Sequence, residues 1–66
     1  MNEKAVLNAF KQNWQIARND GWTINNDIFY PPKSHEANKN NWATIFYKTE
    51  YGILVPHWFV KFYPIG

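Results

Sequence analysis

Apolar residues recur with a helical period at the start of this chain and in shorter, extended runs after it. From Asn2 to about Asn19 they return at steps of three and four, as they do on one face of an α-helix. This stripe consists of Val6, Leu7, Phe10, Trp14 and Ala17. Asn2 is a suitable N-cap, and Gly21 can take the left-handed conformation that ends many helices. The pattern therefore predicts one N-terminal helix.

Two short β-prone runs follow the helix, at Trp22–Ile24 and Ile28–Tyr30. Asn25–Asp27 lies between them and is typical of a turn, so the pattern predicts either a small hairpin or one bent strand. Pro31 and its neighbouring proline end any strand, because neither ring can donate to a ladder. The polar residues 33–41 are predicted to form a solvated loop.

Two longer strands are predicted at 42–48 and 53–63. Residues 49–52 join them, and Gly52 supplies the positive φ that a short hairpin turn needs. Pro56 interrupts the second strand, which favours an edge position or a bulge there. The sequence thus predicts that the aromatic-rich second half of the chain forms a hairpin.

The register of this hairpin decides which side chains share a face. We prefer the register in which Lys48 pairs with Ile53 across a four-residue turn, because it gives one almost purely apolar face. That face holds Ala43, Ile45, Tyr47, Leu54, Pro56, Trp58, Val60 and Phe62. A three-residue turn closing at Thr49 and Ile53 would shift the register by one and mix the two faces.

The fold predicted from these patterns is α+β, with a single domain over residues 1–66. Its N-terminal helix packs on one face of a small antiparallel sheet of three or four strands. The helical stripe is expected to meet Tyr47, Ile45, Leu54, Trp58, Val60 and Phe62.

Aromatic residues number thirteen of 66, and eight of them lie between Trp42 and Tyr63. One helix covers only one face of such a sheet, so several rings are predicted to face outward unless the 31–41 loop, the C-terminal tail or a second subunit covers them. The residues predicted to bind a partner on this outer face are Trp42, Phe46, Lys48, His57, Phe59, Lys61 and Tyr63.

Candidate chemistry beyond binding is sparse. There is no Cys, which excludes disulfides and thiolate metal sites. The two histidines, His35 and His57, lie too far apart for a metal spacing, and the scattered acids form no carboxylate pair. We therefore predict no metal, no cofactor and no catalytic residue. No run approaches the roughly 18 apolar residues of a membrane span, so no membrane contact and a cytoplasmic location are expected.

These observations favour a small, non-enzymatic binding protein of the kind frequent among phage and mobile-element accessory proteins. It would act by protein–protein contact or by self-association, with a homodimer as one form. The formal net charge of +2 also permits a nucleic acid. In that alternative, bases of a single strand stack on Trp42, Phe46, Phe59 and Tyr63 while Lys48 and Lys61 hold phosphates.

An enzyme alternative comes from a resemblance. Gly21-Trp22 and Val55-Pro56-His57, in the order helix, Gly-Trp, strands, resemble the HicA family of small RNA-cleaving toxins. The resemblance implies a helix, three strands and a final helix, with action on messenger RNA. The family's catalytic His follows a Gly-Ser-His-like stretch on an earlier strand, and residues 24–30 of this chain contain no His. No final basic helix is expected here either.

Overall fold

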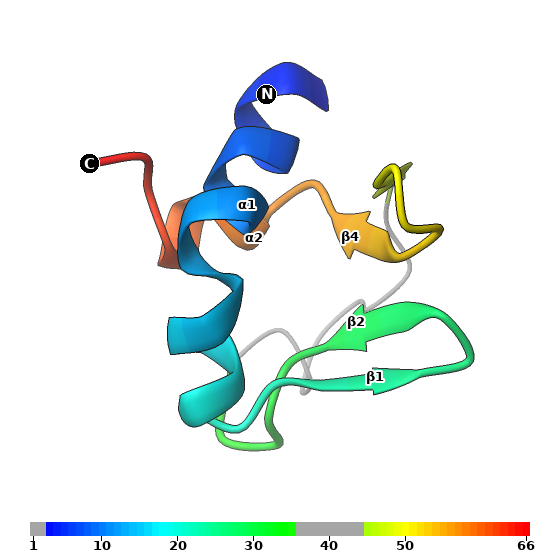
Figure 1. Ribbon diagram of the computed structural model, residues 1–66. Coiled ribbons are helices and arrows are strands. Elements are labelled where there is room, and N and C mark those ends of the chain that lie inside the picture. The colour runs from blue at the N-terminus through cyan, green and yellow to red at the C-terminus, as the bar shows by residue number, and fades with distance from the viewer. Residues whose placement is uncertain (1–2, 36–44) are drawn as a thin grey trace.

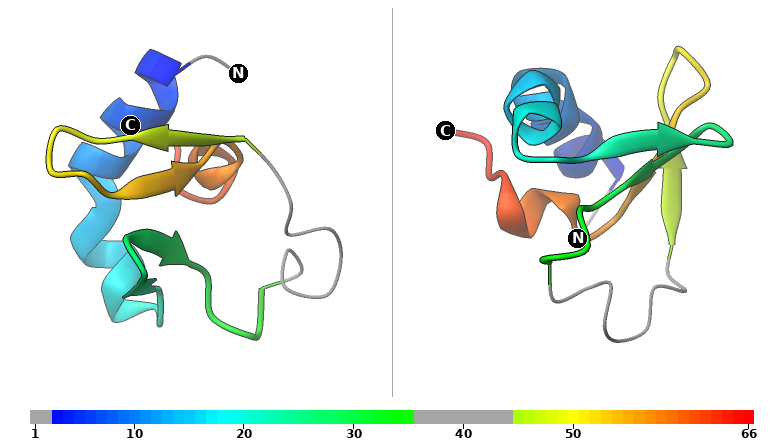
Figure 2. Two further views of the ribbon diagram at one scale, coloured as in Figure 1. Left: turned by 90° about the vertical axis from the view of Figure 1, so that its right-hand side faces the viewer. Right: turned by 90° about the horizontal axis from the view of Figure 1, so that it is seen from below.

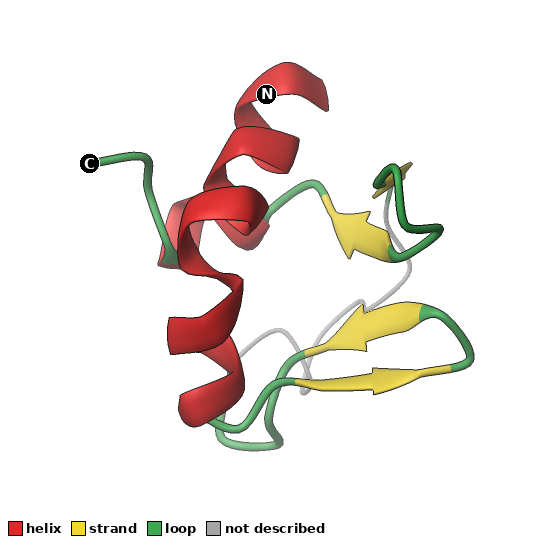
Figure 3. Ribbon diagram, in the orientation of Figure 1, coloured by secondary structure: helices red, strands yellow, loops and turns green. Residues whose placement is uncertain are grey.

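The computed structural model describes residues 3–35 and 45–66. Its elements, in chain order, are α1 (Glu3–Asn19), β1 (Thr23–Asn25), β2 (Ile28–Tyr30), β3 (Phe46–Lys48), β4 (Leu54–Pro56) and α2 (Phe59–Phe62). The four strands form one sheet in the order β1-β2-β4-β3, and both helices lie at one end of it (Figures 1 and 3). The predicted α+β fold, with an N-terminal helix packed on a small sheet, is confirmed.

The sheet is mixed, whereas an antiparallel sheet was predicted. β1–β2 and β3–β4 are antiparallel hairpins, but β2 pairs with β4 in parallel. This order gives a central position to β4, whose residues are all apolar, and leaves β3, with the exposed Lys48, at an edge. β4, which consists of apolar residues alone, thus has a neighbouring strand on each side.

α1 ends as its sequence predicts. Gly21 has a φ of 113°, its N–H donates to the Arg18 carbonyl, and the Trp22 N–H donates to the Ala17 carbonyl. This pair of bonds is a Schellman motif, in which a left-handed glycine lets the chain turn back and satisfy the last helical carbonyls. The turn carries Trp22 directly against Ala17, and both are buried. The predicted start at Asn2 lies outside the described residues.

β1 and β2 form the small hairpin that was one of the two arrangements predicted for these residues, the other being a single bent strand. Asn26 and Asp27 have φ values of 53° and 64°, so both central residues of the turn are left-handed, as in a type I′ turn. Asn and Asp tolerate this conformation better than other residues with a Cβ. The chain therefore folds sharply here, and Phe29 comes to lie opposite Ile24.

The second hairpin, formed by β3 and β4, has the other of the two predicted registers, in which a three-residue turn closes at Thr49 and Ile53. Lys48 pairs with Leu54, and the Thr49 N–H donates to the Ile53 carbonyl at 2.8 Å across a three-residue loop. The Thr49 hydroxyl also accepts from the Ile53 N–H, and Gly52 has a φ of 84°. Such loops place a left-handed residue, here a glycine, at their last position, and this local chemistry outweighs the gain of one uniformly apolar face.

The shifted register reverses every side chain of β4 relative to β3. Val55, predicted on the outer face, lies opposite Tyr47 and is fully buried beneath α1. Leu54 and Pro56, predicted to meet the helix, pair with Lys48 and Phe46 on the other face. A one-residue slip in an antiparallel pair has this consequence because side chains alternate with a period of two.

The long second strand predicted at 53–63 is wrong. The strand stops at Pro56, which has no N–H to extend the parallel ladder with β2, while the bonding to β3 runs one residue further, where the His57 N–H donates to the Ile45 carbonyl at 2.8 Å. The chain then turns through Trp58 into the helix α2. Helical spacing brings Trp58 against Phe62, with ring centroids 5.4 Å apart. The predicted first strand is also shorter than expected: within the described residues it begins at Phe46, and Ile45 precedes it.

The core is an aromatic cluster centred on Trp22. Its ring lies 5.1 Å from those of Phe29 and Phe59 and 5.8 Å from that of Trp58. The buried apolar residues are Val6, Ala9, Phe10, Ala17, Trp22, Phe29, Val55, Trp58 and Phe59. Trp58 was predicted to be inside, and it is.

Several other core predictions are wrong. α1 turns Ala9 inward and leaves Trp14 partly exposed, whereas the predicted stripe had Trp14 in the core. Ile45 and Phe62 were also expected beneath the helix, and both are exposed. Tyr47 and Val60 are partly buried and pack against the core, as predicted.

Candidate functional site

The outer aromatic face predicted from the sequence does not form as one surface. Phe59 is fully buried at the centre of the core, so its predicted exposure is wrong. Phe46, His57 and Tyr63 are half-buried, and Lys48 and Lys61 are exposed. These residues belong to β3, to the turn after β4, to α2 and to the chain after it, because the predicted strand 53–63 is broken at Pro56. Trp42 lies outside the described residues.

Tyr63 has a structural contact. Its hydroxyl donates to a carboxylate oxygen of Asp20 at 2.7 Å, and this bond ties the end of α2 to the end of α1. Burial of the phenol and the Asp20 carboxylate together raise the pKa of Tyr63 to about 12. The indole N–H of Trp22, which makes no well-formed hydrogen bond within the described residues, acts in the opposite direction. Tyr63 thus joins two helices.

A groove opens on the other side of α1, away from α2. Its volume is about 610 Å³, and it lies between α1, β1 and the β3–β4 turn. The residues that line it are Leu7, Asn8, Phe10, Lys11, Trp14, Arg18, Ile24, Thr49, Glu50, Tyr51 and Ile53. This size falls in the range of ligand and peptide sites in proteins. We call this concavity the α1 groove.

The helical wall of the α1 groove alternates basic and apolar side chains. Leu7, Lys11, Trp14 and Arg18 follow one another at steps of four, three and four, so they lie along one line of the helix. Trp14 is 39% exposed, which is high for so large an apolar side chain. The wall therefore offers an indole with a positive charge on either side of it.

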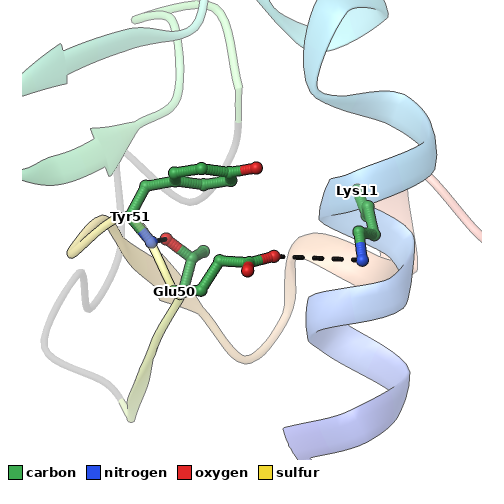
Figure 4. A network of polar contacts seen from close by, with 4 residues as sticks. Lys11, Glu50 and Tyr51 are labelled. Atoms are coloured by element: carbon green, nitrogen blue, oxygen red, sulfur yellow. Dashed lines mark hydrogen bonds and ion pairs between the residues drawn. The ribbon is translucent and has the colours of Figure 1, made fainter.

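The opposite wall is the β3–β4 turn, whose conformation is held by Thr49. The Thr49 hydroxyl accepts hydrogen bonds from the N–H groups of Tyr51 and Ile53, at 3.2 and 3.1 Å. The turn holds the Tyr51 ring outward, 77% exposed, beside Glu50 (Figure 4). A tyrosine side chain with few rotatable bonds on a hydrogen-bonded turn loses little entropy when a partner covers it.

One ion pair crosses between the two walls. Lys11 Nζ on α1 lies 3.9 Å from Glu50 Oε1 on the turn (Figure 4). Both side chains are largely exposed, so the pair contributes little to stability. Arg18 also lines the α1 groove, and within the described residues no carboxylate lies in ion-pair distance of it. The groove therefore carries a net positive charge.

The sequence analysis named none of the exposed groove residues as a site. Leu7 and Trp14 were assigned to the core, and Tyr51 was treated as part of a turn. The predicted strands 42–48 and 53–63 are long enough to cover the whole apolar stripe of the helix, whereas each observed strand has three residues, so the sequence carried no signal for the exposure of Trp14. An aromatic residue at a turn tip, such as Tyr51, was a signal that the sequence did carry.

Within residues 3–35 and 45–66, no group of three or more His, Cys, Asp or Glu side chains is arranged to hold a metal ion. No helix in the same ranges is long and apolar enough to cross a membrane. Comparison of this chain with protein-family models, with curated proteins and with solved structures gave no match.

Proposed function

We propose that this chain is a small, non-enzymatic binding protein that holds a segment of a protein partner in the α1 groove. The observation that carries the proposal is the gathering of three large, exposed apolar side chains, Trp14, Ile24 and Tyr51, around one concave surface. Apolar side chains that cluster in a concave surface with a charged rim are typical of interaction sites. Covering them would remove apolar surface from water, which is the main driving force of association.

The charges of the groove favour an acidic partner segment. Among the residues that the structure describes, no carboxylate pairs with Arg18, and Lys11 pairs with the solvent-exposed Glu50 alone. An acidic group on the partner gains a charge-assisted hydrogen bond from Arg18, whose planar guanidinium suits a carboxylate. The proposed ligand is therefore a protein segment that carries large apolar side chains beside Asp or Glu.

Two residues are expected to dominate the affinity. Trp and Tyr side chains that become fully desolvated at an interface often contribute about 2 kcal/mol or more each. Trp14 and Tyr51 stand on opposite walls, so one inserted side chain would contact both. Lys11 and Arg18 at the rim would mainly set the association rate and the orientation of the partner.

A peptide library displayed on phage tests this proposal. Selection against the wild-type protein should enrich peptides that combine aromatic or aliphatic residues with Asp or Glu. Their affinity should fall by about tenfold to a hundredfold for Trp14→Ser or Tyr51→Ser. The matched control is Ile65→Ser, which removes an equally exposed apolar side chain outside the groove and should leave binding unchanged.

Two results would overturn the proposal. One is a selection that yields no binder, and the other is a set of binders that the Trp14→Ser protein holds as tightly as wild type. Binders without acidic residues would contradict the proposed role of Arg18 while leaving the apolar contact in place.

The nucleic-acid alternative predicts a different dependence on salt. It required four rings on one face, and one of them, Phe59, is buried. Binding of a labelled single-stranded oligonucleotide with a steep loss of affinity at high salt would favour it over a protein partner. A final helix, α2, which the resemblance implies and which was not expected from the sequence, is present, but it has four residues with Lys61 as its one basic side chain, and it adds no catalytic group to the five residues that suggested RNA cleavage.

A further inference from the structure

The backbone of Ile24 faces the free edge of the sheet. In a hairpin with a two-residue turn, the flanking residues, here Asn25 and Ile28, form a hydrogen-bonded pair. The next pair, Ile24 and Phe29, is then a non-hydrogen-bonded pair. Ile24 therefore directs both its N–H and its carbonyl away from β2.

The other side of β2 agrees with this assignment. The Asp27 carbonyl accepts from the Leu54 N–H at 2.7 Å, so the odd-numbered residues of β2 face β4. Its even-numbered residues then face β1 and pair with Asn25 and Thr23. Within residues 3–35 and 45–66, neither backbone group of Ile24 hydrogen-bonds to another backbone group.

We infer that two copies of this chain associate by antiparallel pairing of β1 with β1 around a two-fold axis at Ile24. Each Ile24 donates its N–H to the Ile24 carbonyl of the second copy and accepts the reciprocal bond, so both edge groups are satisfied. Thr23 of one copy then lies opposite Asn25 of the other. The two four-stranded sheets become one continuous sheet.

The composition of β1 permits this pairing. Proteins commonly block free edges with lysine, proline or a bulge, and Thr23–Asn25 contains none of these. The strand carries no charge, so two copies meet without like-charge repulsion. Seen from below, β1 lies at the near edge of the sheet (Figure 2, right). The Ile24 side chain is 44% exposed, and in the pair it would lie beside its symmetry mate on the same face of the sheet.

Pairing also has a consequence for the α1 groove. Ile24 lines that groove as well as the edge, so a two-fold axis at Ile24 would bring two grooves next to each other. The dimer would present a doubled contact surface to a partner. This inference stands on the backbone geometry of β1 and does not depend on the proposed peptide binding.

Sedimentation of the purified protein over a concentration series tests the dimer. The contact is small, so we expect reversible association in which the mass rises from monomer to dimer with concentration. Ile24→Pro removes the outward N–H and leaves the hydrogen bonds to β2 intact, and it should weaken dimerisation by about tenfold or more, because both symmetric hydrogen bonds are lost. Ile24→Lys keeps the backbone, places like charges at the axis, and should have the same effect if the proline variant does not fold.

The control is Ile16→Lys, which makes the same change at an exposed isoleucine of α1 and should leave dimerisation unchanged. A wild-type protein that stays monomeric at every concentration would overturn the inference. So would a dimer that survives both Ile24 variants, or one that is lost only in Trp14→Ser, since the latter places the second copy in the groove. Peptide binding measured on the wild-type protein, at concentrations where sedimentation shows the monomer, keeps the two proposals separate.

Discussion

The two sides of α1 differ although one helix supplies a wall to both. On one side Phe10 packs against Phe29 and Phe59, and those two rings are fully buried beneath α2. On the other side Trp14 faces Tyr51 across the α1 groove, and both remain exposed. Of the two aromatic-rich sides of α1, one is therefore buried and the other is exposed.

The difference lies in which element closes each side. α2 has four residues, yet it fills its side because Phe59 points inward between the helix and the sheet. Among the described residues, β1 and the β3–β4 turn line the other side without filling it, and the turn contributes one ion pair and the exposed Tyr51 ring. The described residues therefore close one side of α1 and leave large apolar side chains exposed on the other.

Alanine substitution should separate the two sides most strongly. Phe59→Ala leaves a cavity in the closed side and is expected to cost about 3–5 kcal/mol, which is close to the whole stability expected for a chain of this size. Trp14→Ala, on the open side, should cost about 1 kcal/mol because the ring is only partly covered. Urea denaturation followed by far-UV circular dichroism measures both.

Phe59→Ala must cost more stability than Trp14→Ala if the two sides of α1 differ as described. Equal losses of stability would mean that the open side is part of the core. In that case the peptide selection would have to be repeated with Tyr51 variants alone.

The sequence predicted the elements that local chemistry decides. α1 and its glycine end follow from helical spacing and from Gly21, and the first hairpin follows from its Asn-Asn-Asp turn. In both cases the residues of one short segment are sufficient to favour its conformation. Tertiary contacts only confirm what those residues already favour.

The sequence failed where two local patterns competed. Residues 53–63 alternate like a strand, but Trp58, Phe59 and Phe62 also recur at helical steps, and the chain takes the helical alternative once its bonding to β3 ends at His57. The groove was missed for the same reason, since its walls come from segments whose approach depends on the register at Thr49. The approach of segments that are far apart in the sequence cannot be predicted from any one of those segments.

Substitution of two glycines, one on each side of α1, tests the same difference with smaller expected losses of stability. Gly21 has a φ of 113°, and a Cβ there would meet the Pro32 Cβ at 3.0 Å. Gly52 has a φ of 84° with nothing within 4 Å of an added Cβ. Gly52→Ala should therefore cost only the left-handed penalty, about 1 kcal/mol, and Gly21→Ala should cost more, about 2–3 kcal/mol. Thermal unfolding of the two variants in parallel measures the difference, and an equal cost would show that Pro32 moves aside freely.

The smallest expected effects come from the polar contact on each side. Tyr63→Phe breaks the hydrogen bond to Asp20 on the closed side and should cost less than about 1 kcal/mol, because that contact is solvent-exposed. Glu50→Gln breaks the ion pair to Lys11 across the groove and should change stability by under about 0.5 kcal/mol. It should instead raise affinity for acidic peptides, since it releases Lys11.

Alkaline pH tests the Tyr63 contact without any ligand. The pKa of Tyr63 is raised from its ordinary value of 10.0 to about 12 in the folded protein, so the folded state binds the phenol proton more tightly than the unfolded state. The stability that Tyr63 contributes is therefore complete below about pH 10 and is lost as the pH rises through about 12. The stability difference between wild type and Tyr63→Phe should shrink over that interval, and Asp20→Asn should flatten its slope because the carboxylate contributes to the shift. Gly52→Ala removes no titratable group and serves as the control, and a matching decline in its difference from wild type would show that the alkaline loss arises elsewhere than at Tyr63.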